Sequence, residues 1–196
     1  MSHAENSVIS LFPLHTVLFP GGPLPLRIFE TRYTDMVRNC MREQQPFGVV
    51  LIQEGEEAGP VATTATVGCS ARIVDFYTLQ DGLLGISCVG ERKFSVLRVW
   101  RAPDGLNVGE VSWLEPEPRI TLPEEYAQFG ASVQRAVAEL AEHYQHVEKH
   151  FDDAAWIGAR ITELIPIGLN EKQVLLELDD PIARLDALLS LVPREK

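Results

Sequence analysis

Three histidines in the second half of the chain have a spacing that could place metal ligands on one side of a helix. His143, His146 and His150 follow Glu139, which lies one helical turn earlier, and all four fall on one side at 3.6 residues per turn. On a straight helix they would spread along about 10 Å, whereas zinc needs its donors about 2.0 Å from one point. We therefore assign no metal and no cofactor, and His143, His146 and His150 stay a speculative site that would need ligands from a neighbouring helix.

Nucleophilic catalysis would need a cysteine or a serine beside a base and a group that orients the base. Cys69 and Cys88 fall in predicted strands, where a thiol is usually a small buried apolar group. Ser70 lacks the G-x-S-x-G turn that exposes a serine nucleophile. No phosphate-binding G-x-x-x-x-G-K-[ST] loop occurs in the 196 residues. The sequence therefore predicts no catalytic residues and a protein that is not an enzyme.

Composition and charge narrow the class of protein. A content of 45% hydrophobic and 23% charged residues is typical of a globular protein and argues against a disordered or fibrous one. The start, MSHAENSVIS, lacks the pattern of a secretion signal, and no apolar run approaches the ~20 residues that span a bilayer. We expect a cytoplasmic protein with no membrane partner. The formal net charge of -11 opposes a phosphate backbone, so we expect no nucleic-acid partner.

The chain changes character near residue 115, which predicts two subdomains. Residues 1–115 consist of short β-prone runs broken by glycine and proline, with one helix that Thr31 can cap and that ends before Gln45. Asp-Gly dipeptides at 81–82 and 104–105 predict two-residue hairpin loops, and a break at 90–91 separates runs over 83–89 and 93–100. These features predict an antiparallel meander that bends into a small β barrel.

The second subdomain, residues 119–196, is predicted to be a helical bundle that follows the Pro-rich segment 115–118. Apolar residues recur there every three or four positions, and Asn170 and Asp180 can act as N-caps. The expected helices cover residues 123–151, 154–164, 170–178 and 181–191.

The most specific feature of the sequence is a long ordered string near its start. This string is LFPLHTVLFPGGPLPL at residues 11–26, followed by IFETRY at 28–33. Further segments are FGVVLI (47–52), VGCSARI (67–73), VGERKF (89–94) and NEKQVLLELDDPIARL (170–185). Together they resemble the amino-terminal domain of the Lon protease family over nearly the whole chain.

The resemblance implies an α+β fold, a PUA-like β pseudo-barrel followed by a helical bundle. In the full protease such a domain engages substrate polypeptides and helps to hold subunits together. The ATPase and Ser-Lys protease domains have no counterpart here, so the chain looks like a stand-alone member: a non-enzymatic, ATP-independent module with a polypeptide or protein partner. The resemblance leaves a homodimer open. His15-Thr16 stands where the family often has Arg-Asp, a form associated with the shorter stand-alone members.

Peptide binding in such a domain would draw on residues near the predicted helix start. Glu30 and Arg32 flank that start, where they could form a local ion pair or contact a peptide. Phe29, Tyr33 and Trp100 could pack in the core and rim, or line the aromatic mouth of a peptide groove. The sequence leaves both interpretations open for these five residues.

The alternative function is a PUA-like site for a small molecule or RNA. It rests on fold analogy and on basic residues in the first subdomain. If these side chains converged on one face, they would form an electrostatic surface for RNA. The residues are Arg72, Arg92, Lys93, Arg98 and Arg101.

Overall fold

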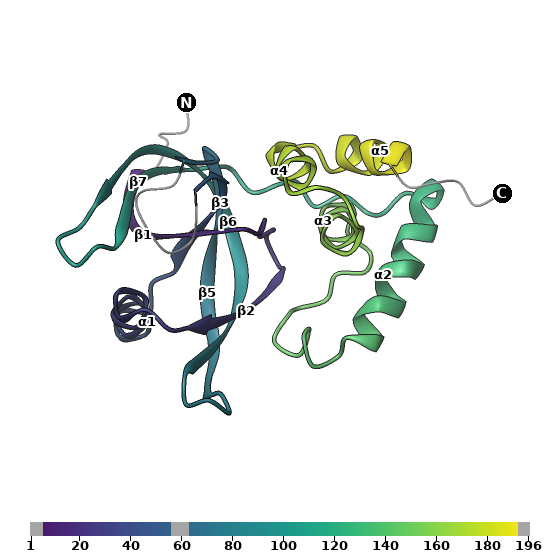
Figure 1. Ribbon diagram of the computed structural model, residues 1–196. Coiled ribbons are helices and arrows are strands. Elements are labelled where there is room, and N and C mark those ends of the chain that lie inside the picture. Colours follow the sequence, from purple (N-terminus) through teal and green to yellow (C-terminus); the bar gives the residue numbers. More distant parts are fainter. Residues whose placement is uncertain (1–5, 56–62, 192–196) are drawn as a thin grey trace. The chain divides into compact units, whose positions relative to one another are not determined.

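The computed structural model describes residues 6–55 and 63–191, and the chain divides into two compact units, Met1–Glu115 and Pro116–Lys196 (Figure 1). No helix within the described residues is long and apolar enough to cross a membrane. The elements of the first unit are β1 (Asn6–Leu14), β2 (Pro23–Ile28), α1 (Thr31–Glu43), β3 (Phe47–Glu54), β4 (Thr63–Thr64), β5 (Val67–Thr78), β6 (Leu84–Arg101) and β7 (Asn107–Trp113). Those of the second are the 3-10 turn η1 (Glu124–Tyr126), α2 (Ala127–Glu139), α3 (Ala154–Leu164), α4 (Leu169–Glu177) and α5 (Pro181–Leu191).

The first unit is built on a seven-stranded, mainly antiparallel sheet with the order β1-β7-β6-β5-β3-β4. β2 adds to the first half of β6, and β1 also pairs with β3 in parallel over four residues. The long strand β6 links the other strands of the sheet. Its first half pairs with β2 and its second half with β7, and β5 pairs with it on the other side along much of its length. The short β1–β3 pairing joins the ends of the path β1-β7-β6-β5-β3, with β2 and β4 outside it, so the sheet is a pseudo-barrel and not a regular closed barrel. The predicted α+β class, a β pseudo-barrel followed by helices, is confirmed.

The two Asp-Gly signals do mark hairpins, but each loop is one residue longer than predicted. In the β5–β6 loop (80–82), the Gly82 N–H donates to the Leu79 carbonyl at 2.9 Å, and Gly82 has a φ of 84°. The β6–β7 loop (103–105) repeats this pattern, and Gly105 also has a φ of 84°. A type I turn followed by glycine in the left-handed conformation produces this three-residue loop.

The break predicted at residues 90–91 does not divide two strands over 83–89 and 93–100. It is a β-bulge inside the single strand β6, because Gly90 and Lys93 pair with Ala71 and Cys69. Two residues of β6 thus stand opposite one residue of β5, which bends the strand without ending it.

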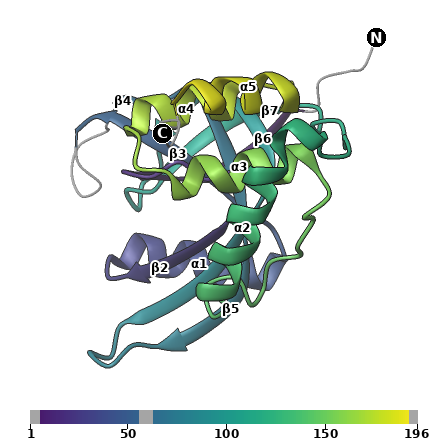
Figure 2. The same ribbon diagram turned by 90° about the vertical axis from the view of Figure 1, so that its right-hand side faces the viewer.

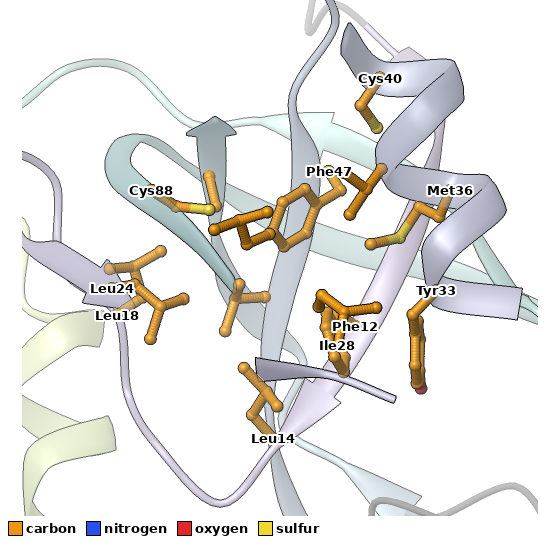
Figure 3. Packing of buried hydrophobic residues seen from close by; sticks show 14 of the residues in the cluster. Phe12, Leu14, Leu18, Leu24, Ile28, Tyr33, Met36, Cys40, Phe47 and Cys88 are labelled. Carbon is orange, nitrogen blue, oxygen red and sulfur yellow. The ribbon is translucent and has the colours of Figure 1, made fainter. Parts of the chain in front are cut away.

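Helix α1 packs one apolar face onto the sheet. Its N-cap residue is Glu30 rather than the predicted Thr31, and its C-cap is Gln44, which adopts a left-handed φ of 53° before Pro46. Figure 3 shows side chains of this face directed toward Phe12 and Phe47 of the strands. The buried residues of α1 are Tyr33, Met36, Val37 and Cys40, the 3 and 4 spacing seen in the sequence.

The second unit is a group of four helices in which α3 is central, with α2 on one side and α4 and α5 on the other (Figure 2). Helix α3 has the predicted bounds, and its N-cap Asp153 accepts a hydrogen bond from the Ala155 N–H at 3.1 Å. Helix α5 also has the predicted bounds, and Asp180 accepts from the Ile182 N–H at 2.9 Å. Helix α4 starts earlier than predicted, with Gly168 rather than Asn170 as N-cap.

The predicted helix over 123–151 is wrong in its length. Only η1 and α2 are helical there, and residues 140–146 form successive turns. The Val147 N–H donates to the carbonyl of Tyr144, three residues back, at 3.2 Å. The Lys149 ammonium donates to the same Tyr144 carbonyl at 3.0 Å. Both Tyr144 and Val147 remain buried, so the apolar period continues past the end of the helix.

Candidate functional site

A cavity of about 350 Å³ opens in the first unit beside β2. Three consecutive parts of the chain form its walls: the end of β1 with the following loop, strand β2, and the start of α1. Apolar and aromatic side chains dominate the lining, and its charged and polar residues other than Tyr33 are exposed or half-buried. The lining residues are Phe12, Leu14, His15, Thr16, Leu24, Pro25, Leu26, Arg27, Ile28, Phe29, Glu30 and Tyr33.

The inner wall of this cavity belongs to the hydrophobic core. The rings of Phe12 and Tyr33 stack with centroids 3.8 Å apart and an interplanar angle of 18°. Leu14, Leu24 and Ile28 lie in the same buried cluster, as Figure 3 shows. Because core packing fixes these side chains, the inner wall is a preformed apolar surface.

The rim carries an exposed aromatic ring and one ion pair. Phe29 is 63% exposed, although it lies next to the buried Ile28. The Arg32 guanidinium contacts the Glu30 carboxylate at 2.9 Å and donates to the Gly105 carbonyl at 2.9 Å. Arg32 therefore ties the start of α1 to the β6–β7 loop, and it positions the rim without lining the cavity.

A second hollow, of about 630 Å³, lies beside the same strand. Arg27 and Asp81 form an ion pair at its edge. The ring of Tyr77 lies over Gly85, where a Cβ atom would collide with it. This more open hollow shares Pro25, Leu26 and Arg27 with the cavity, and its other lining residues are Tyr77, Leu79, Gln80 and Asp81.

The structure brings together three of the five residues selected from the sequence for peptide binding. Phe29, Glu30 and Tyr33 line the cavity, and Arg32 supports Glu30. Trp100 lies elsewhere, on β6 opposite Val108, and lines neither hollow. The sequence analysis did not identify the β1 and β2 walls as a binding surface, although residues 11–26 formed the most specific string of the sequence.

The basic residues on which the alternative function rests are buried or contact other groups of the first unit. Lys93 is buried. The other contacts are Arg72 Nε to Glu91 Oε1 (2.6 Å), Arg92 over the Trp113 ring (5.1 Å), Arg98 over the Trp100 ring (5.7 Å) and Arg101 Nε to the Gly105 oxygen (3.1 Å).

The structure separates the histidine candidates from a single helix face and buries the cysteine candidates. His143 and His146 lie in the turns after α2 and His150 lies beyond them, so they do not share the helix face that a metal site would require. No group of three or more potential metal ligands occurs among residues 6–55 and 63–191. Burial raises the pKa of the Cys40 thiol to about 11 and that of Cys88 to about 12, which keeps both protonated at neutral pH.

Comparison with known proteins places these features in a family. The sequence matches the family described as ATP-dependent protease La (LON) substrate-binding domain over residues 8–194. A Lon N-terminal domain protein from Xanthomonas campestris is 38% identical, with a TM-score of 0.78 over 95% of this chain and 99% of that one. The N-terminal domain of Mycobacterium avium complex Lon protease shares the fold, with 16% identity and a TM-score of 0.60 over 94% of this chain and 97% of that one.

Longer relatives match as well. Lon protease from Anaeromyxobacter dehalogenans is 26% identical over 97% of this chain and 23% of its own length. Lon protease 2 from Myxococcus xanthus is 26% identical over 96% of this chain and 24% of its own length. The chain thus spans about a quarter of the curated relatives that it matches. With a family match over nearly all of its residues, the chain belongs to the Lon substrate-binding domain family.

Proposed function

We propose that this chain is a non-enzymatic, ATP-independent module that binds polypeptides through the apolar cavity beside β2. The observation that carries the proposal is that cavity, with Phe29 exposed at its rim and the stacked Phe12 and Tyr33 at its inner wall. Preformed apolar surface with a few polar groups around it is typical of a binding site. The substrate-binding description of the family supports a polypeptide as the ligand.

The chemistry of the lining favours binding over covalent reaction. The cavity has room for one or two large apolar side chains, and its polar lining consists of His15, Thr16, Arg27 and Glu30. Glu30 and Arg27 already pair with Arg32 and Asp81. Such a site would orient a ligand through apolar contact, and an unfolded polypeptide offers the side chains that a folded protein buries.

Two exposed phenylalanines allow a matched test of the cavity. Phe29 lines it, whereas Phe76 on β5 is similarly exposed at 57% and lines neither hollow. The probe is a permanently unfolded protein, reduced and alkylated, with a fluorescent label for anisotropy titration. We expect Phe29→Ser to weaken binding at least about fivefold, from loss of apolar contact, and Phe76→Ser to leave it within about twofold. Absence of binding by the unchanged protein, or equal losses in both variants, would contradict the proposal.

The cellular setting is part of the same proposal. We infer a cytoplasmic location, which the buried thiols of Cys40, Cys69 and Cys88 support: they form no disulfide, and such thiols persist in reducing compartments. The homodimer stays a prediction, and light scattering over a concentration series would test it.

A further inference from the structure

The outer edge of β2 has few hydrogen-bond donors, and the register shows why. The Gly90 N–H donates to the Gly22 carbonyl at 2.9 Å, just before β2 pairs with β6, and this bond shows which residues of the two strands face each other with their backbone groups. Hydrogen-bonded positions alternate along an antiparallel pair. Leu24, Leu26 and Ile28 therefore direct their backbone groups toward β6.

The intervening residues, Pro23, Pro25 and Arg27, direct their backbone groups to the opposite edge. That edge pairs with no other strand in the described part of the chain, and the side chains of Pro25 and Arg27 are exposed. Proline has no N–H, so only Arg27 offers a donor among these three residues. Proline at an edge strand is a known protection against the addition of another strand.

Pro25, Leu26 and Arg27 nevertheless border both hollows of the first unit. One hollow presents the stacked Phe12 and Tyr33, and the other presents Tyr77 and Leu79. The same strand therefore combines an edge that discourages backbone pairing with apolar surface for side chains.

We infer that the cavity recognises a polypeptide by the insertion of apolar side chains beside β2, and that the peptide backbone does not pair with the β2 edge. This inference rests on the proposed function. It distinguishes this site from grooves in which a peptide extends the sheet through main-chain hydrogen bonds. The ligand is an extended segment defined by its side chains.

Charge completes the description of the ligand. The chain has a formal net charge of -11, and within residues 1–115 the sequence has 9 basic and 13 acidic residues, a balance of -4. Arg27 and Glu30 of the cavity already pair with Asp81 and Arg32. The electrostatic field of the whole chain therefore decides which ligand charge is preferred. An acidic protein attracts cationic segments. The preferred ligand is an apolar side chain flanked by lysine or arginine.

Synthetic peptides test the recognition mode on the unmodified chain. The parent peptide has one central phenylalanine in a polar sequence with lysine at both flanks. In two further peptides every second backbone nitrogen is methylated, which removes the N–H donors needed for strand addition. One peptide carries the methyl groups on the odd residues and the other on the even residues, so that each edge of the extended backbone is blocked in one of them. We expect both to bind within about twofold of the parent, and replacement of the phenylalanine by serine to weaken binding more than about tenfold.

The outcomes separate the two proposals. Tenfold weaker binding of either N-methylated peptide would overturn side-chain insertion and leave polypeptide binding intact. If no peptide bound, both proposals would fail together. Glutamate flanks should weaken binding at least about fivefold at about 20 mM salt, and this difference should shrink as salt screens the field. Equal affinity of the lysine-flanked and glutamate-flanked peptides at low salt would overturn the charge preference.

Discussion

Arg184 is the clearest case of a single residue on which the helical unit depends. Its side chain is 1% exposed, and its guanidinium donates to both Glu117 oxygens at 2.7 and 2.6 Å. It also donates to the carbonyls of Leu175 and Leu178. We predict that Glu117→Ala lowers the free energy of unfolding by about 3–5 kcal/mol, because it leaves a buried cation without its counterion. Urea unfolding followed by circular dichroism measures this change.

A surface ion pair in the same unit supplies the control. Arg119 and Asp152 approach to 3.3 Å, with side chains 63% and 70% exposed. Solvent screens this pair, so Arg119→Ala should cost less than about 1 kcal/mol. A similar cost for Arg119→Ala and Glu117→Ala would show that burial does not set the strength of the Arg184 contacts.

The three thiols give a second prediction at this scale. Cys40, Cys69 and Cys88 are buried and form no disulfide, and burial raises the pKa of Cys40 and Cys88 to about 11 and 12. A thiol reagent reacts with the thiolate, so at pH 8 we expect native protein to react at least about a hundredfold more slowly than protein in urea. An absorbance assay with a disulfide reagent counts the reacted thiols. Rapid reaction of one thiol in the native state would identify an exposed, activated cysteine and would contradict the burial of the three thiols.

The Glu30–Arg32 pair shows how far sequence reasoning reaches for single residues. Their positions at a helix start left a local ion pair and a peptide contact both open, and in the structure they pair at 2.9 Å. The second partner of Arg32, the Gly105 carbonyl, lies 73 residues away in sequence and depends on the sheet topology. Trp100 was selected for its aromatic ring alone, and only the strand register places it away from the cavity.

At the scale of elements, Gly90 fixes the segment that leads into β2. The Gly21 N–H donates to the Gly90 carbonyl at 2.7 Å, and a Cβ atom at Gly90 would collide with the Phe19 carbonyl. We predict that Gly90→Ala displaces this segment with β2, destabilises the protein by more than about 2 kcal/mol and weakens peptide binding. Thermal unfolding and anisotropy titration measure the two effects.

Gly82 is the matched control for this prediction, because a Cβ atom there would meet nothing within 4 Å. Its φ of 84° still penalises alanine, by about 1–2 kcal/mol. Gly82→Ala should therefore lose some stability and retain its peptide affinity. If Gly90→Ala had the same small effect on both measurements, the tight approach at Gly90 would not position β2.

The bounds of helices with strong capping signals were predictable from the sequence, and the bounds that depend on tertiary packing were not. Helix α5 follows from Asp180 as N-cap and Pro181 at the first helical position, and α3 has the bounds that its pattern predicts. The end of α2 did not follow, since the buried Tyr144 and Val147 continue the apolar period through turns. Hydrophobic periodicity reports which side chains are buried, and it leaves the backbone between them unspecified.

For the whole molecule, the resemblance supplied what local patterns could not. It implied a β pseudo-barrel followed by helices, but it did not reveal a cavity built from three successive parts of the chain. Closure of that cavity requires β2 to pair with β6, about 60 residues later in sequence, and no periodicity encodes such a pairing.

The response to alkaline pH is a further property of the whole molecule, because both units contain groups whose pKa is raised. In the first unit, burial raises the pKa of Cys40 to about 11 and that of Cys88 to about 12. In the second, the hydrogen bond to Asp186 raises the pKa of Tyr126 to about 12, and burial raises that of Tyr144 to about 12. These groups keep their protons in the folded chain at a pH where the unfolded chain releases them.

Stability should therefore be complete below about pH 9 and fall as the pH rises toward about 12, since the folded state binds more protons throughout that range. The urea midpoint, measured from pH 7.5 to 11, should stay level at first and then decline. Tyr126→Phe, which removes the phenol that donates to Asp186 at 2.7 Å, should be less stable at pH 8 by about 1–2 kcal/mol but decline less steeply. A midpoint that stays level to pH 11, or an unchanged slope in the variant, would show that these groups keep their ordinary pKa values in the folded protein.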